Sequence, residues 1–137
     1  IPNKKLRDKF DAYQKHEHRS SVNAFNALTT YYGYKYGEEW LDSVNNIIFE
    51  NYNYFCSKLS KYFEISTLEG SYLIFVNIGK YNKDKNAANY LIKKCHIMTN
   101  AGEVFGGKKY KNWVRVNLAT SLANVKKACK ELEKITK

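Results

Sequence analysis

The sequence predicts an α/β chain of the α+β sandwich type, with a small sheet of about three strands covered by helices and preceded by a long helix. Three observations lead to this prediction. Apolar residues recur at helical spacing from Trp40 to Tyr62, two later runs read as strands, and helical patterns with capping residues follow both runs. The expected order after the long helix is strand, helix, strand, strand, helix.

Two more helices are expected before the long one. The first opens near Pro2, where a proline costs little because the first helical amides have no partner anyway. The second runs from about Val22 to Tyr32 and is expected to end near Gly33, since glycine is common just past a helix end. The chain should therefore begin with three helices in succession.

The middle of the chain predicts a strand and then a helix. Residues 69–79, EGSYLIFVNIG, are apolar at neighbouring positions, as in a strand that is covered on both faces. Asp84 is expected to cap the helix that follows, and Thr120 or Ser121 to cap the last helix of the chain.

A glycine-rich stretch lies between two further strands, expected at residues 96–99 and 113–119. From Gly102 to Lys108 it reads G-x-x-x-x-G-K, the opening of a phosphate-binding loop. That loop needs Ser or Thr next and then a helix, whereas this chain has Lys109 and then an alternating strand pattern. We interpret the stretch as a turn and not as a nucleotide site.

Composition limits the class of protein. The 137 residues, 44% hydrophobic and 15% aromatic, are enough for one domain with a core, and no long apolar run predicts a membrane span. The three cysteines, Cys56, Cys95 and Cys129, are too scattered for a zinc site and odd in number for a closed set of disulfides. We expect reduced thiols in a cytoplasmic protein that holds no metal.

The net charge of +10 raises the alternative of a non-catalytic basic module that binds nucleic acid or an acidic partner. Of the 23 basic residues, however, only Arg7, Arg19 and Arg115 are arginines, and the lysines are spread along the whole chain. A solvated basic surface, without nucleic acid, is the favoured interpretation.

Arg115 is the unusual residue of the predicted sheet. It lies in mid-strand between Val114 and Val116, and alternation places it on one face with Trp113 and Asn117. A partly buried guanidinium needs a partner. It could form a structural ion pair with one of the thirteen acidic residues, or it could hold a ligand carboxylate. The residues alone leave both alternatives open.

Five motifs, in this order and spacing, resemble one family. IPNKKLRDKF, YGEEWLD, LEGSYLIFVNIG, NAGEVFGG and WVRVNLATS resemble the C-terminal small domain of pyridoxal-phosphate (PLP) enzymes of the aspartate-aminotransferase fold. YGEEWLD makes the chain most similar to the cystathionine β-lyase type of C–S lyase. The resemblance covers nearly the whole chain.

The resemblance implies a role for four residues. Arg115 would grip the α-carboxylate of an amino-acid substrate, after a glycine turn that includes Gly102. Ala101 stands where the family usually has proline. Gly70 and Tyr72 match a strand near the substrate channel. No catalytic and no cofactor-binding residue is expected in this chain.

The resemblance also implies what the chain would lack. The family's Schiff-base lysine lies in a Ser-x-x-Lys segment just before the equivalent of Ile1, and other cofactor contacts belong to the large domain. We therefore expect a C-terminal piece, inactive by itself, of a homodimeric PLP enzyme. Residues 1–35 would form a helical connector to the large domain and residues 36–137 the small domain.

The implied reaction is α,β-elimination from cystathionine or a cysteine-like amino acid, giving pyruvate, ammonia and a thiol. An aminotransferase on the same scaffold is the alternative. In the family this segment would pack against the large domain or a second subunit, so that the separated chain would expose an apolar patch between Val22 and Tyr36, which could allow self-association. The residues expected in that patch are Phe25, Leu28, Tyr31 and Tyr32.

Overall fold

The computed structural model describes residues 1–17 and 23–137, so that Arg19 and Val22 lie outside the described residues. The chain divides into two compact units, residues 1–41 and 42–137. Each is described here by itself. The boundary falls within the long helix α3 (Glu38–Leu59).

The first unit contains the two expected helices, α1 (Lys4–His16) and α2 (Ala24–Tyr36). The amide oxygen of Asn3 caps α1. The predicted end of the second helix near Gly33 is wrong, because α2 continues to Tyr36 and the Gly37 amide still donates to the Gly33 carbonyl, at 2.9 Å. A glycine inside a helix costs only about 1 kcal/mol, so that it need not end one.

The apolar side chains of α2 are exposed. Phe25 is 78% exposed, and Leu28, Tyr31 and Tyr32 are 52–55% exposed. The prediction of an exposed patch is confirmed for these four residues. That a large domain or a second subunit covers these side chains in a larger assembly stays a prediction.

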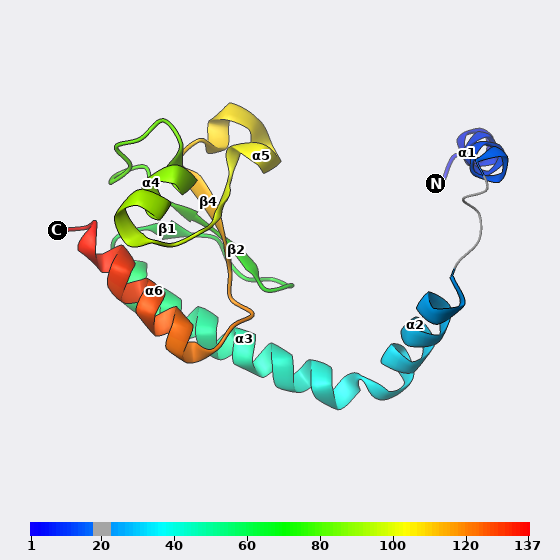
Figure 1. Cartoon of the computed structure of the whole chain (residues 1–137), viewed down its shortest axis with the longest axis horizontal. Coiled ribbons are helices and arrows are strands. Elements are labelled where there is room, and N and C mark those ends of the chain that lie inside the picture. Colours follow the sequence, from blue (N-terminus) through cyan, green and yellow to red (C-terminus); the bar gives the residue numbers. More distant parts are fainter. Residues whose placement is uncertain (18–22) are drawn as a thin grey trace. The chain divides into compact units, whose positions relative to one another are not determined.

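The second unit confirms the predicted fold class, a mixed helix-and-sheet domain (Figure 1). Its sheet has the order β1-β2-β4-β3 within the described residues, with all neighbours antiparallel. The elements after α3 are β1 (Glu64–Ile65), β2 (Leu73–Asn77), α4 (Ala87–Cys95), β3 (Asn100–Ala101), α5 (Glu103–Gly106), the 3-10 helix η1 (Gly107–Tyr110), β4 (Trp113–Asn117) and α6 (Leu122–Lys134).

The sheet differs from the prediction in two places. It has one strand more than expected, because the two-residue β1 pairs with the end of β2. The strand predicted at residues 96–99 begins instead at Asn100. His96 ends α4 in the left-handed conformation, with φ of 55°. After this turn the chain pairs with β4 only from Asn100 onward.

One face of the sheet forms the core. The buried side chains Ile74 and Val76 of β2 and Val114 of β4 point to this face. They belong to one apolar cluster with residues of α3, α4 and α6, the helices that lie beside the sheet in Figure 1. The alternate residues of β2 are only half-buried. The strand expected to be covered on both faces is thus fully buried on one face and half-buried on the other.

Asn51 of α3 joins the helix to the end of β4. Its side chain is fully buried, and its amide nitrogen donates to the carbonyls of Leu118 at 2.9 Å and Thr120 at 2.8 Å. The next residue, Ser121, caps α6, which decides between the two predicted caps. These contacts fix where the strand that carries Arg115 ends.

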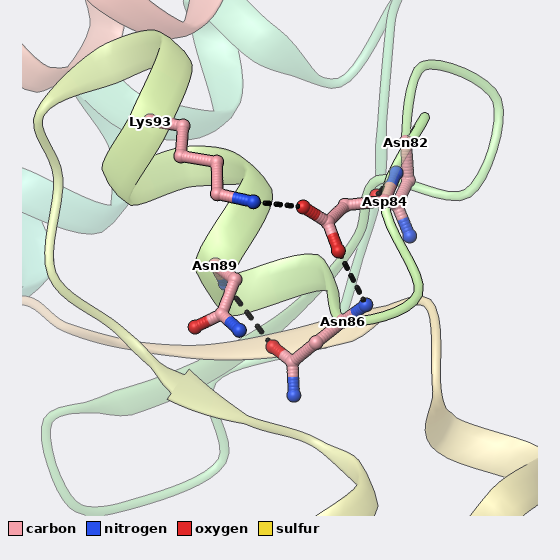
Figure 2. A network of polar contacts seen from close by, with 5 residues as sticks. All are labelled: Asn82, Asp84, Asn86, Asn89 and Lys93. Carbon is pink, nitrogen blue, oxygen red and sulfur yellow. Dashed lines mark hydrogen bonds and ion pairs between the residues drawn. The ribbon is translucent and has the colours of Figure 1, made fainter.

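The start of α4 is held by a polar network (Figure 2). The predicted cap, Asp84, is wrong: Asn86 caps the helix through the Asn89 amide, at 3.1 Å. Asp84 instead accepts from the Asn86 amide and pairs with Lys93 at 2.7 Å. The hydrogen bond from Lys93 is the main cause that lowers the pKa of the Asp84 carboxyl.

None of the helices within residues 1–17 and 23–137 combines the length and the apolar character needed to cross a bilayer.

Candidate functional site

Arg115 lies at the centre of β4, between the two neighbouring strands. Its cross-strand partners are Phe75 of β2 and Asn100 of β3. Directly opposed residues share a face of the sheet, and residues two apart on one strand do so as well. Phe75, Trp113 and Arg115 therefore lie together on the face away from the core, and Arg115 is half-buried there.

Three neighbours hold the Arg115 side chain in place. One guanidinium nitrogen, Nη2, donates to the Asn100 side-chain oxygen at 3.2 Å. The guanidinium carbon lies 4.2 Å from the centre of the Phe105 ring, a cation–π contact. Phe105 in turn meets Phe75 edge-to-face, with ring centres 5.8 Å apart. The guanidinium is thus fixed by an amide on one side and an aromatic ring on its face.

The structure bears on the two alternatives for Arg115. Among the described residues no carboxylate lies within ion-pair distance of its guanidinium. Its Nε atom is buried and has no hydrogen-bond partner. A desolvated cationic donor of this kind is costly unless an anion meets it. The structural ion pair is therefore absent from the part of the chain that the structure describes.

Gly102 and Gly106 allow two aromatic residues to close on the turn. The Gly102 amide donates to the Trp113 carbonyl at 2.8 Å, and a Cβ at Gly102 would lie 2.7 Å from Trp113 Cβ and 2.9 Å from the Tyr110 carbonyl. A Cβ at Gly106 would lie 2.0 Å from the ring of Tyr110. Only glycine fits at this distance. The stretch predicted as a turn is thus a tight one, built from α5 and η1 between β3 and β4.

A pocket opens on the same side of the sheet. Its volume is about 530 Å³, within the usual range for small-molecule sites. Ser66 is the one serine among the residues that line the pocket, and its Oγ accepts from the Phe75 amide at 2.9 Å. The remaining walls are aromatic rings and glycine backbone. The lining residues are Ser66, Phe75, Gly102, Phe105, Gly106, Tyr110 and Trp113.

The structure brings together two of the four residues that the resemblance assigns to substrate. Gly102 and Arg115 both contact Phe105. The Gly102 carbonyl accepts from the Phe105 amide at 2.9 Å, and the Arg115 guanidinium lies over the Phe105 ring. Tyr72 and Gly70 lie before β2, at the end of the sheet where the Tyr72 carbonyl accepts from the Leu118 amide. Gly102 lies at the opposite end, beside Trp113.

The sequence did not single out three residues of this site, which are Phe75, Asn100 and Phe105. Their places depend on strand register and on the packing of a short helix, which no local pattern specifies. One signal was present: Phe105 is the only aromatic residue between Gly102 and Gly106. A large side chain among glycines that permit close approach indicates a packed turn and not a flexible one.

The described residues contain neither a cluster of metal ligands nor a reactive buried thiol. They contain no group of three or more His, Cys, Asp or Glu side chains placed to hold a metal. Burial raises the pKa of the Cys129 thiol to about 11, and it also raises the pKa of Cys95. Both thiols therefore stay protonated near neutral pH and are poor nucleophiles.

The family model for aminotransferase class I and II matches residues 16–132. The chain belongs to the class I and II aminotransferase family. The resemblance found in the sequence is thereby confirmed. No curated protein matches the sequence significantly.

Solved structures show the same aminotransferase fold. A PLP-bound aminotransferase-like protein from Clostridium difficile 630 aligns with all of this chain at 21% identity and a TM-score of 0.85. A PLP-bound C–S lyase from Staphylococcus hominis aligns with 99% of it at 24% identity and a TM-score of 0.81. Cystalysin from Treponema denticola, which contains pyridoxal 5'-phosphate, aligns with 98% at 22% identity and a TM-score of 0.83.

The aminotransferase-family chain spans 35–36% of the length of these three structures. Each of the three holds the cofactor that the sequence resemblance implied. Identities below a quarter establish the fold and leave the reaction to be argued from the site.

Proposed function

We propose that this chain provides the substrate-carboxylate site of a PLP-dependent C–S β-lyase that acts on cystathionine and related cysteine-like amino acids. The observation that carries the proposal is Arg115: a guanidinium fixed on a strand, with a buried Nε that has no partner and no described carboxylate nearby. Family membership and the C–S lyases among the matching structures support it.

Arg115 would bind and orient the α-carboxylate of the substrate. A guanidinium offers two parallel N–H donors that match a carboxylate, and stacking on Phe105 with the bond to Asn100 limits its rotation. Holding the substrate in one orientation lowers the barrier by removing the entropy of alignment. Gly102 would allow the turn to close on the ligand, and Tyr72 and Gly70 would border the channel.

The site suits a substrate carboxylate and not the cofactor itself. The described contacts of Arg115 are an amide and an aromatic ring, with no lysine for covalent attachment and no carboxylate for a pyridine nitrogen. When bound elsewhere in the enzyme, PLP supplies the electron sink for the chemistry at Cα. We assign no residue of this chain to it.

The rest of the proposal concerns organisation. Residues 1–35 would act as a helical connector, residues 36–137 as the small domain, and the exposed side chains of α2 would be covered in a homodimeric enzyme. All three cysteines are free, as is usual in a reducing compartment such as the cytoplasm.

The same geometry serves an aminotransferase, the activity given in the name of the matching Clostridium difficile structure. The two activities are separated by incubating the enzyme that carries this chain with L-cystathionine and PLP. Pyruvate released without an added keto acid supports the lyase. Product that appears only when a keto acid is added supports the aminotransferase and overturns the lyase proposal.

The role of Arg115 has its own test. In the same enzyme Arg115→Gln should raise KM for the amino acid about 10- to 100-fold, because a hydrogen-bonded charge pair with the substrate is lost. Arg115→Lys keeps the charge but not the fork and should fall in between. The exposed Arg7→Gln is the matched control and should not change KM. An unchanged KM in Arg115→Gln would remove the carboxylate role.

A further inference from the structure

Asn100 is the side chain that holds the Arg115 guanidinium from the neighbouring strand. The two residues are register partners across β3 and β4, and the Asn100 side-chain oxygen accepts from Arg115 Nη2 at 3.2 Å. A guanidinium carries only donors, so the amide must turn its oxygen towards it. The bond therefore helps to set the direction in which the guanidinium points.

The tight turn after β3 fixes the position of Asn100. The Gly102 amide donates to the Trp113 carbonyl at 2.8 Å, which holds the end of β3 against β4. A Cβ at Gly102 would lie 2.7 Å from the Cβ of Trp113, so that only glycine lets the two segments approach this closely. One consequence of this close approach is that Asn100 is held opposite Arg115.

Both groups that hold the guanidinium are uncharged. The Asn100 amide binds one nitrogen, and the Phe105 ring lies against the guanidinium face at 4.2 Å. Within residues 1–17 and 23–137, none of the ion pairs includes Arg115. The side chain is thus oriented by neutral groups, and the described part of the chain does not compensate its positive charge.

An aspartate at position 100 would have nearly the same shape as the asparagine and the opposite effect on the charge. Its carboxylate would bind Arg115 through a charge-assisted hydrogen bond, about twice as strong as a neutral one. It would also cancel the positive charge that attracts an anionic ligand and would compete with that ligand for the same donors. The neutral amide therefore orients the guanidinium without occupying its charge.

We propose that Asn100 is a positioning residue of the substrate site, which orients Arg115 towards the substrate's α-carboxylate and, because it is uncharged, leaves the positive charge of Arg115 to the substrate. The proposal rests on the proposed function, because Arg115 must bind that carboxylate. Asn100 acts through Arg115 and takes no part in bond breaking, so that it governs binding of the substrate and not the chemical step.

The first test measures KM and kcat for L-cystathionine in the enzyme that carries this chain, with a keto acid present so that elimination and transamination are both detected. Asn100→Asp should raise KM about tenfold or more and change kcat little, because the new carboxylate competes with that of the substrate. Asn100→Gln keeps a neutral amide oxygen and should retain most of the affinity.

Asn117→Asp is the matched control. Asn117 lies two residues along β4 from Arg115, on the same face of the sheet, and its oxygen accepts from the Ala119 amide. The substitution adds the same charge to this face without a contact to the guanidinium. KM should therefore change much less, because solvent and salt screen the exposed charge.

Stability of the chain gives a second, independent measurement. Asn100→Asp should unfold at the same urea concentration as the unchanged chain or at a higher one, because it gains an ion pair with Arg115. A merely structural role of Asn100 would lower stability and affinity together. The chain has three arginines, so that the Arg115 side-chain NMR signal is identified by its loss in Arg115→Lys. This signal should shift in Asn100→Asp and much less in Asn117→Asp.

The outcomes separate the two proposals. If Arg115→Gln leaves KM unchanged, or if the enzyme does not consume L-cystathionine, the proposed function is wrong and the role of Asn100 falls with it. If Arg115→Gln raises KM and Asn100→Asp does not, the carboxylate site stands and the role of Asn100 is overturned. Equal rises in KM for Asn100→Asp and Asn117→Asp, or a loss of stability in Asn100→Asp, would overturn that role as well.

Discussion

Removing the Asn51 side chain should destabilise the second unit by about 2 to 4 kcal/mol. Asn51→Ala deletes two hydrogen bonds, at 2.9 Å and 2.8 Å, and leaves the carbonyls of Leu118 and Thr120 without that donor. Each lost bond costs about 1 kcal/mol net. The Leu118 carbonyl still accepts from the Thr120 amide at 2.9 Å, so only the Thr120 carbonyl is left unsatisfied, which costs about 1–3 kcal/mol more. The Asn51 side-chain oxygen is itself buried without a partner, so its removal returns part of this cost.

The assay is thermal and urea unfolding followed by circular dichroism. For a unit of this size about 1 kcal/mol corresponds to about 4 °C, so that Tm should fall by about 8–16 °C. Asn53→Ala is the matched control, since Asn53 lies on the same helix but is exposed. Exposed alanine favours helix slightly, and this control should be neutral or mildly stabilising.

A second substitution tests the reasoning independently of side-chain volume. Asn51→Asp keeps the shape but at neutral pH presents only acceptors to two carbonyl oxygens, and it should destabilise at least as much as Asn51→Ala. Lowering the pH protonates the carboxyl, restores one donor and should recover part of the loss. If Asn51→Ala and Asn53→Ala unfold within about 0.5 kcal/mol of each other, the junction between α3 and β4 does not depend on these bonds.

Two further predictions concern ionisable groups. At pH 8 an alkylating reagent should modify the half-buried Cys56 first, and Cys95 and Cys129 only after unfolding, because burial keeps the thiols of Cys95 and Cys129 protonated. Peptide mass spectrometry checks the order of modification. Early modification of Cys129 would contradict its raised pKa. Because Lys93 lowers the pKa of Asp84, this carboxylate contributes stability above the ordinary aspartate pKa of about 4 and loses it as pH falls through the lower folded value. Asp84→Asn should therefore be less stable than the unchanged protein at pH 7, and its stability should fall less at acidic pH. Urea unfolding of both proteins at pH 7 and at acidic pH measures this, and an equal loss of stability in acid would contradict the pairing.

The fold was predictable where the apolar pattern is long. The α3 helix and the strand β4 follow directly from periodicity, because burial of one face imposes a repeat on the sequence, and β2 follows from its continuous apolar run. Errors arose where several local solutions have similar energy. Asp84 and Asn86 are both good caps, and Gly33 tolerates either a helix or its end. Only tertiary contacts decide between such alternatives.

The site was predictable along its own strand and, through the family resemblance, at Gly102 of the turn. Arg115 stands out because a charged residue in mid-strand is unusual, and its neighbour Trp113 follows from alternation. Phe75 and Asn100 reach it through strand register, and Phe105 through packing of α5. These three depend on contacts between segments far apart in the sequence, about which local composition carries no information.

The pairing of Phe75 with Arg115 also determines when the site can form. The two residues are about forty positions apart, so that bringing them together costs about 3 kcal/mol of loop-closure entropy before any contact compensates it. Such non-local pairing slows folding. During synthesis, nothing that depends on this register can assemble until β4 has left the ribosome. The ligand site should therefore appear with the last cooperative step of folding, and loss of ligand binding during unfolding should coincide with loss of the sheet.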